Sequence, residues 1–271
     1  MSLQKKATLV ASATALILIV IKLSVGFYTG TVVVIASAID SALDFIISVF
    51  NAYAITKAQK PMDTHYNYGR GKVEGLASLI EGAIITLSGL FIIVAAGHKL
   101  INGEETVGIG ASLAVMGVSI VLTASLVLYL NMVYKKTKNL IIKSDALHYK
   151  SDLYTNIGII ASLGVIYFTG WSFIDPIVSI GIALFVIYSA WEIIKEGLEM
   201  LLDKAIDDET VGEIKQILQK HVEAENCIIS GYHDLKTRKS GHINFVDVHI
   251  VFNDKVLLKE SHELADHIED R

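Results

Sequence analysis

The chain has little of what soluble and disulfide-bonded proteins use heavily. Of its 271 residues, one is cysteine and two are proline, and 19% are charged, whereas a typical soluble domain has about 25% charged residues. A single cysteine, Cys227, excludes an internal disulfide and any metal site built on paired cysteines. The formal net charge of −5 at pH 7 shows no basic excess, so nucleic acid is not an expected partner.

Apolar residues make up 52% of the chain and are concentrated in six long blocks. A helix needs about 20 apolar residues to cross the hydrocarbon core of a bilayer, and each block is longer than that. Helices are the expected elements because a backbone in lipid must satisfy its own hydrogen bonds. We therefore predict a membrane domain at residues 1–200, with spans at about 7–29, 32–56, 74–101, 107–134, 145–169 and 174–198.

Lysine and arginine gather in alternate connections between these blocks. They occur at the N-terminus, in the 57–73 and 135–143 loops and after residue 195, while the other connections have almost none. Because positive residues mark the cytoplasmic side of a membrane protein, both termini are predicted to be cytoplasmic. Two termini on one side require an even number of spans, which agrees with six.

Residues 201–271 are predicted to form a separate cytoplasmic α+β domain. Residues 208–222 have apolar positions at helical spacing and acids in the first turn. Two alternating stretches separated by "KSG" then predict a β-hairpin, and the closing "LLKESHELADHIEDR" predicts a second helix. The order α-β-β-α is typical of an open, ferredoxin- or metallochaperone-like sandwich in which two helices cover one face of a sheet.

Two aspartates interrupt the second apolar block, in "SAIDSALDF". Asp40 and Asp44 are four residues apart, so they point from one face of a helix. A charged residue at the centre of a membrane helix costs about 2.5–3.5 kcal/mol on insertion scales, so an offsetting interaction is expected. One interpretation is structural, with hydrogen bonds to serine or threonine of neighbouring helices; the other is metal binding.

A second pair with the same spacing favours metal binding. His148 and Asp152 lie near the start of the fifth block, again four residues apart. His148 alone would fit an interfacial histidine, but the two pairs together offer three carboxylates and one imidazole. This set suits a tetrahedral divalent cation, Zn²⁺ above all, with Fe²⁺, Cd²⁺, Co²⁺ and Mn²⁺ as alternatives. Asn156, one turn further on, is predicted to orient a ligand.

At these motifs the chain resembles the cation diffusion facilitator family of divalent-metal transporters. The resemblance rests on "DSALD" (40–44), "HYKSD" (148–152), "YGRGKVE" (68–74), "LLDKAIDDE" and "GYHDLKTRKSG", in the family's order. It implies a homodimer in the bacterial inner membrane that exports metal from the cytoplasm in exchange for protons. The family's Asp-Asp-His-Asp transport site carries over onto Asp40, Asp44, His148 and Asp152, a set that accepts Fe²⁺ or Cd²⁺ beside Zn²⁺.

The resemblance also implies further roles in the dimer. His233, His249 and His262 match cytoplasmic positions that bind metal between two protomers. Lys72 and Asp203 match a pair that forms interlocking salt bridges in family dimers, although both would also pass as ordinary juxtamembrane charges. The family's last strand carries more ligands and lies beyond the end of this sequence, so we expect a truncated or naturally shortened domain that lacks this strand.

Two other positions are weaker candidates. In "PMDTHYNYGRGK", Asp63 matches a family loop ligand, but the two histidine positions are Tyr66 and Arg70, and His65 is displaced by one residue. We therefore favour a solvated basic loop over a metal site there. Glu81, in the third block, either lines the access path of the cation or is a protonated or paired carboxylate within the bundle.

The titratable ligand set predicts coupling to protons, because these groups bind metal only when deprotonated. Two other functions stay open. A metal-sensing membrane scaffold that does not transport would need only the cytoplasmic histidines. An intramembrane metalloenzyme would need three protein ligands and an open position for water, whereas four ligands are predicted here and no HExxH motif is present. We therefore predict a metal/proton antiporter and not an enzyme.

Overall fold

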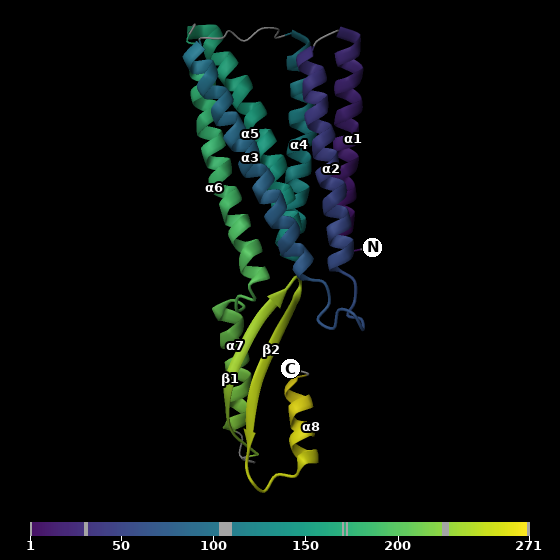
Figure 1. Ribbon diagram of the computed structural model, residues 1–271, viewed down its shortest axis with the longest axis vertical. Coiled ribbons are helices and arrows are strands. Elements are labelled where there is room, and N and C mark those ends of the chain that lie inside the picture. The colour runs from purple at the N-terminus through teal and green to yellow at the C-terminus, as the bar shows by residue number, and fades with distance from the viewer. Residues whose placement is uncertain are drawn as a thin grey trace. The chain divides into compact units, whose positions relative to one another are not determined.

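A computed structural model shows two compact units, Met1–Leu201 and Leu202–Arg271, each of which is described by itself (Figure 1). The structure describes residues 2–29, 32–102, 110–169, 171, 173–223 and 228–269. The predicted order, a helical membrane domain followed by a small α+β domain, is confirmed. The predicted start of the fourth span at residue 107 and the single cysteine at position 227 lie outside the described residues.

The described part of the first unit is a bundle of six long helices. They are α1 (Leu3–Thr29), α2 (Val32–Ala58), α3 (Lys72–Asn102), α4 (Gly110–Thr137), α5 (Leu140–Thr169) and α6 (Ile174–Leu201). Each of α1, α2, α3, α4 and α6 contains a stretch that is long and apolar enough to cross a membrane. α5 is of similar length and packs against α3, α4 and α6, but its first half carries several charged residues. The N-terminus and residues 59–71 lie at the same end of the bundle (Figure 1).

The interior of this end of the bundle is packed with aliphatic side chains. Ile55 of α2, Leu130 of α4 and Ile141 of α5 are fully buried in one cluster, together with Tyr149. By contrast, large apolar side chains such as Phe91 are exposed on the outside of the bundle. Exposed apolar surface on this scale marks an interaction face, and on a bundle of this length it fits contact with lipid.

Helices α3 and α6 pack closely along a seam of small residues. The small-residue seam consists of one residue every seventh position on each helix: Gly75, Gly82 and Gly89 of α3, and Ala183, Ala190 and Gly197 of α6. A Cβ added at Gly75 would lie 3.0 Å from the carbonyl oxygen of Gly197, and one added at Gly197 would lie 2.8 Å from that of Gly75. Small residues are therefore required where the two backbones meet, as is common between membrane helices.

The second unit contains α7 (Asp208–Val222), β1 (Ile229–Ser240), β2 (Ile243–Phe252) and α8 (Leu258–Glu269). The strands are antiparallel, with Ser240 paired to Ile243 across a tight turn in which Gly241 has φ 63°. α7 begins after Asp207, whose carboxylate accepts a hydrogen bond from the backbone N–H of Thr210 at 2.9 Å. This bond lowers the pKa of Asp207, which stays ionised as the N-cap.

Candidate metal centres

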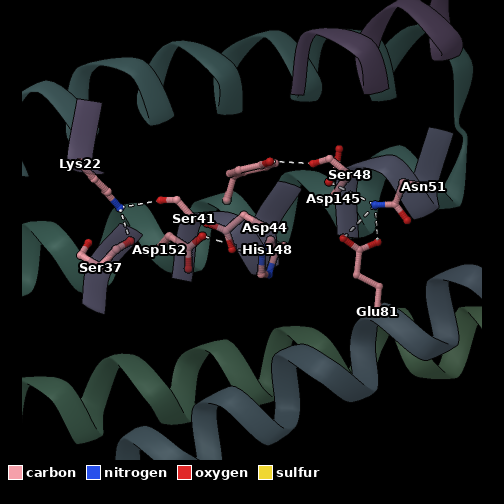
Figure 2. A network of polar contacts seen from close by, with 11 residues as sticks. Lys22, Ser37, Ser41, Asp44, Ser48, Asn51, Glu81, Asp145, His148 and Asp152 are labelled. Carbon is pink, nitrogen blue, oxygen red and sulfur yellow. Dashed lines mark hydrogen bonds and ion pairs between the residues drawn. The ribbon is translucent and has the colours of Figure 1, made fainter. Parts of the chain in front are cut away.

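One imidazole and two carboxylates converge inside the membrane bundle. Nε2 of His148 on α5 lies 3.0 Å from Oδ1 of Asp44 on α2 and 3.9 Å from Oδ2 of Asp152. The ligand atoms of all three residues lie within 4.8 Å of one another. Figure 2 shows the three side chains from close by. His148 is buried, and both aspartates are half-buried. Because metal–ligand bonds to nitrogen and oxygen are about 2.0–2.2 Å, small side-chain movements would close this group around one cation.

The fourth predicted ligand, Asp40, is not part of this group. Its residue is exposed, and it lies one helical turn, about 6 Å, from Asp44 along α2. Spacing in the sequence gives the face of α2 on which both aspartates lie, but not how far α5 follows that face. α2 and α5 have only a small contact. The structure therefore brings Asp44, but not Asp40, into one group with His148 and Asp152. Asn156 is half-buried one turn beyond Asp152, and its role in orienting a ligand stays a prediction.

A buried lysine lies beside the carboxylates. Nζ of Lys22 on α1 donates hydrogen bonds to Oγ of Ser41 at 2.7 Å and to the backbone carbonyl of Ser37 at 3.2 Å (Figure 2). The Lys22 ammonium also interacts electrostatically with Asp44 and Asp152. It therefore places one amino group, which is positively charged when protonated, next to the ligand group. The sequence analysis missed this residue, although a lone lysine within an apolar span was a visible signal.

A second polar group lies further along α2, toward the end of the bundle with residues 59–71. We call it the inner acidic cluster, and it consists of Asn51, Glu81, Ser144 and Asp145. Nδ2 of Asn51 lies 3.2 Å from both carboxylate oxygens of Glu81 and 3.2 Å from Oδ1 of Asp145. The Ser144 hydroxyl donates a further hydrogen bond to Glu81.

Sequence analysis found only Glu81 of this cluster. Asn51 lies on the same face of α2 as Asp44, seven residues on, and Asp145 is three residues before His148. Helical spacing was therefore the signal that could have found both. One turn from Asn51, the hydroxyl groups of Ser48 and Tyr149 lie 2.7 Å apart and join α2 to α5.

In the loop after α2, the Asp63 carboxylate accepts hydrogen bonds from other residues of the loop. Oδ1 of Asp63 accepts hydrogen bonds from the backbone N–H groups of His65 and Tyr66, at 3.0 and 2.9 Å. Arg70 donates to Oδ2 of Asp63 at 2.6 Å and stacks over the Tyr66 ring at 4.0 Å. The hydrogen bond from Arg70 lowers the pKa of Asp63. Both carboxylate oxygens of Asp63 thus already accept hydrogen bonds within the loop. Whether Asp63 and His65 bind metal stays a prediction.

The hairpin of the second unit brings two predicted histidines together. His233 of β1 pairs with His249 of β2, and their ring centroids are 5.1 Å apart. A bulge follows His233, where Asp234 has φ 55°. This puts Oδ2 of Asp234 4.0 Å from Nδ1 of His233 and 3.9 Å from Nδ1 of His249. All three side chains are exposed, and their ligand atoms lie within 4.8 Å of one another.

The third predicted cytoplasmic histidine lies elsewhere. Nε2 of His262 on α8 is 3.7 Å from Oδ2 of Asp266, one turn later on the same helix. It is not in the His233, Asp234 and His249 group. The sequence analysis missed Asp234, because a bulge that turns a side chain toward its neighbours leaves no periodic signal.

The residues of the predicted dimer salt bridge have partners within the chain. Nζ of Lys72, at the start of α3, donates to the backbone carbonyl of Leu201 at the end of α6, at 3.1 Å. Oδ1 of Asp203 lies 3.4 Å from Nη1 of Arg238 in the second unit. A contact between protomers is not tested by one chain, so the pairing of Lys72 with Asp203 stays a prediction.

Comparison with known proteins covers both units. The family described as the cation efflux transmembrane domain matches residues 8–202, and the one described as the cation efflux protein cytoplasmic domain matches residues 206–271. Proteins named cation-efflux pump FieF from Klebsiella pneumoniae subsp. pneumoniae, Shigella boydii serotype 18 and Escherichia coli O127:H6 are each 32% identical over 267 residues. Each match covers 98% of this chain and 87% of the relative. The chain therefore belongs to the cation diffusion facilitator family of cation-efflux transporters.

Proposed function

We propose that this transporter exports Zn²⁺, or a divalent cation of similar chemistry, from the bacterial cytoplasm in exchange for protons. Membership of the family makes the chain a transporter and not an enzyme. The convergence of Asp44, His148 and Asp152 in the bundle carries the proposal. Asp40 would complete the set as the fourth ligand after a movement of its side chain or of α2.

The donor set defines the class of cargo. One imidazole nitrogen with carboxylate oxygens suits Zn²⁺, and also Fe²⁺, Cd²⁺, Co²⁺ and Mn²⁺. Mg²⁺ and Ca²⁺ instead prefer six or more oxygen ligands, which this group does not offer. The named relatives are cation-efflux pumps, and that wording leaves the choice of metal to experiment.

Charge balance supports the exchange with protons. The four proposed ligands carry a formal charge of −3 when His148 is neutral and the three aspartates are ionised. A bound dication removes most of this charge, and nearby Lys22 offsets part of the remainder. After release, an empty and fully ionised group within a membrane is costly, so protons replace the metal. Efflux of metal and uptake of protons are thereby linked.

The proposed assembly is a homodimer in the inner membrane with both termini in the cytoplasm. The second unit matches a cytoplasmic domain of cation-efflux proteins, which supports this orientation. Lys72 and Asp203 would then link the protomers, and His233, Asp234 and His249 would bind metal in the cytoplasm.

A metal-sensing scaffold is the second candidate, and the exposed His233, Asp234 and His249 group favours it, since such a site can report the cytoplasmic metal level without transport. The scaffold and the transporter differ in one observable. A sensor would bind metal in its cytoplasmic unit and carry no flux.

Transport by reconstituted protein tests the proposal. Purified full-length chain in proteoliposomes should move Zn²⁺ when a pH gradient is imposed, and a proton ionophore should abolish the driving force. We expect Asp44→Asn and His148→Ala to lose at least tenfold in rate. Asp254→Asn and His65→Ala, at exposed positions outside the site, are the matched controls and should transport normally. Flux in Asp44→Asn equal to that of the parent protein would rule out the proposed site.

A further inference from the structure

We propose that the inner acidic cluster is a second intramembrane cation site, which receives the divalent cargo before it reaches His148. This inference rests on the proposed function for the identity of the cargo. Asn51 lies seven residues beyond Asp44 on α2, about 10 Å along the helix. It lies toward the end of the bundle that carries residues 59–71, which the distribution of lysine and arginine predicts to be cytoplasmic. The cluster therefore lies between the predicted cytoplasmic surface and the Asp44 group.

The inner acidic cluster contains two buried acidic side chains close together. Glu81 is 1% exposed and Asp145 is 0% exposed. They lie on different helices, and the side-chain amide of Asn51 donates hydrogen bonds to both. Their hydrogen-bond partners in the described chain are Asn51 and Ser144, and neither is charged. His148 interacts electrostatically with both carboxylates, but it makes no hydrogen bond to either in the described structure. Two ionised carboxylates buried without a directly bonded cation are strongly unfavourable. Uptake of positive charge, as protons or as a cation held between the two carboxylates, stabilises this arrangement.

Two oxygen atoms in the cluster have no hydrogen-bond partner among the described residues. Oδ1 of Asn51 and Oδ2 of Asp145 are buried and accept no hydrogen bond in the described structure. Both residues are 0% exposed, so water at the surface does not serve them. Buried polar atoms without partners are rare and call for an explanation, such as an ion. Figure 2 shows Asn51 and Glu81 directed toward each other and toward Asp145.

The amide of Asn51 can bind the carboxylates when the site is empty and a cation when the site is occupied. Its nitrogen now lies 3.2 Å from oxygens of Glu81 and Asp145, where its two N–H groups stabilise the carboxylates. A half-turn about the last side-chain bond exchanges the amide oxygen and nitrogen. The oxygen of Asn51 would then point at a cation held by Glu81 and Asp145, with the Ser144 hydroxyl as a further ligand.

The donor set also predicts the order of affinities. All four groups offer oxygen, which suits Mn²⁺ and holds Zn²⁺ less well than a site with an imidazole. The inner acidic cluster should therefore bind Zn²⁺ more weakly than the Asp44, His148 and Asp152 group. A weaker site that precedes a tighter one loads the tighter site and does not retain its cargo.

Equilibrium binding to the full-length chain tests the inference. The background variant carries Asp44→Ala, His148→Ala, His233→Ala and His249→Ala, which removes two ligands from each of the other two proposed metal sites. We expect it still to bind one Mn²⁺ per protomer in detergent, detected by electron paramagnetic resonance. Glu81→Gln in this background should weaken binding at least tenfold. This substitution keeps the size of the side chain and one accepting oxygen but removes the negative charge, and Asp145→Asn is a second variant that should act in the same direction.

Two results would overturn the inference. One is a background variant, folded by its thermal transition, that binds no Mn²⁺, as expected if the carboxylates hold only protons. The other is binding that neither Glu81→Gln nor Asp145→Asn weakens. Failure of the proposed function is a different result, because the parent protein would then carry no Zn²⁺ flux in proteoliposomes. In an active transporter, Glu81→Gln should raise the KM for Zn²⁺ at least fivefold and leave equilibrium Zn²⁺ binding at the Asp44 group within twofold.

Discussion

The small-residue seam between α3 and α6 makes a sharp prediction for Gly197→Ala. The added Cβ would lie 2.8 Å from the carbonyl oxygen of Gly75 and 3.3 Å from the backbone nitrogen of Leu79. Both atoms belong to the backbone of α3, so no rotamer change can relieve the contact. The two helices must move apart instead, and overpacking of this kind destabilises a protein by about 1–3 kcal/mol.

A matched glycine on the same helix isolates this effect. Gly181 of α6 has nothing within 4 Å of an added Cβ. Alanine is better than glycine in a helix by about 0.8–1.0 kcal/mol, and both substitutions gain this amount. The difference in stability between Gly197→Ala and Gly181→Ala therefore measures the clash alone, at about 1–3 kcal/mol. For a chain of this size, each kcal/mol shifts the melting temperature by about 2–4 °C.

The assay is thermal unfolding of purified protein in one detergent, followed by intrinsic fluorescence. Gly181→Ala should melt at or above the temperature of the parent protein, and Gly197→Ala clearly below Gly181→Ala. Gly82→Ala should fall between them, because its added Cβ meets a side-chain atom, Cγ1 of Ile194, at 2.8 Å, and not a backbone atom. Equal melting temperatures for Gly197→Ala and Gly181→Ala would refute the close backbone contact between α3 and α6.

Three further predictions concern single polar groups. Tyr149→Phe leaves the Ser48 hydroxyl without its partner and should destabilise the bundle by about 1–3 kcal/mol in the same thermal assay. Because the Arg70 hydrogen bond lowers the pKa of Asp63 below the ordinary 3.8, the loop contact is complete at neutral pH and is lost only as the pH falls through that lowered value. Proteolysis of the loop should thus be constant between pH 8 and 5, whereas Arg70→Ala should raise the Asp63 pKa measured by NMR. Lys22→Met removes a positive charge beside the ligands and should tighten Zn²⁺ binding in calorimetry; unchanged or weaker binding would contradict its role.

Much of the fold follows from patterns that act over short distances. Apolar length alone predicts the membrane helices, because each must satisfy its backbone within lipid. The helix predicted at 208–222 coincides with α7, since Asp207 caps it and its apolar spacing is regular. The hairpin was equally readable, because "KSG" separates two alternating stretches and Gly241 adopts the positive φ of the turn.

The sites were less predictable, because they depend on which helices pack against each other and over what length they stay in contact. Spacing put Asp40 and Asp44 on one face of α2 but could not show that only Asp44 reaches the group on α5. Asn51 and Asp145 satisfy the same helical spacing, yet nothing local links them to Glu81 on a third helix. Asp234 depends on a bulge that follows from strand pairing across the hairpin.

The small contact between α2 and α5 has a consequence for the cohesion of the bundle. α2 packs mainly against α1, and α5 mainly against α4 and α6, so the backbones of the two helices on which the proposed ligands lie have only a small contact. A cation held by Asp44, His148 and Asp152 would act as a cross-link between them. Binding at a hundredfold excess over Kd adds about 2.7 kcal/mol to stability. The free-metal concentration of the buffer would then help to set the melting temperature, so the cargo would also serve as a transient structural part of its own carrier.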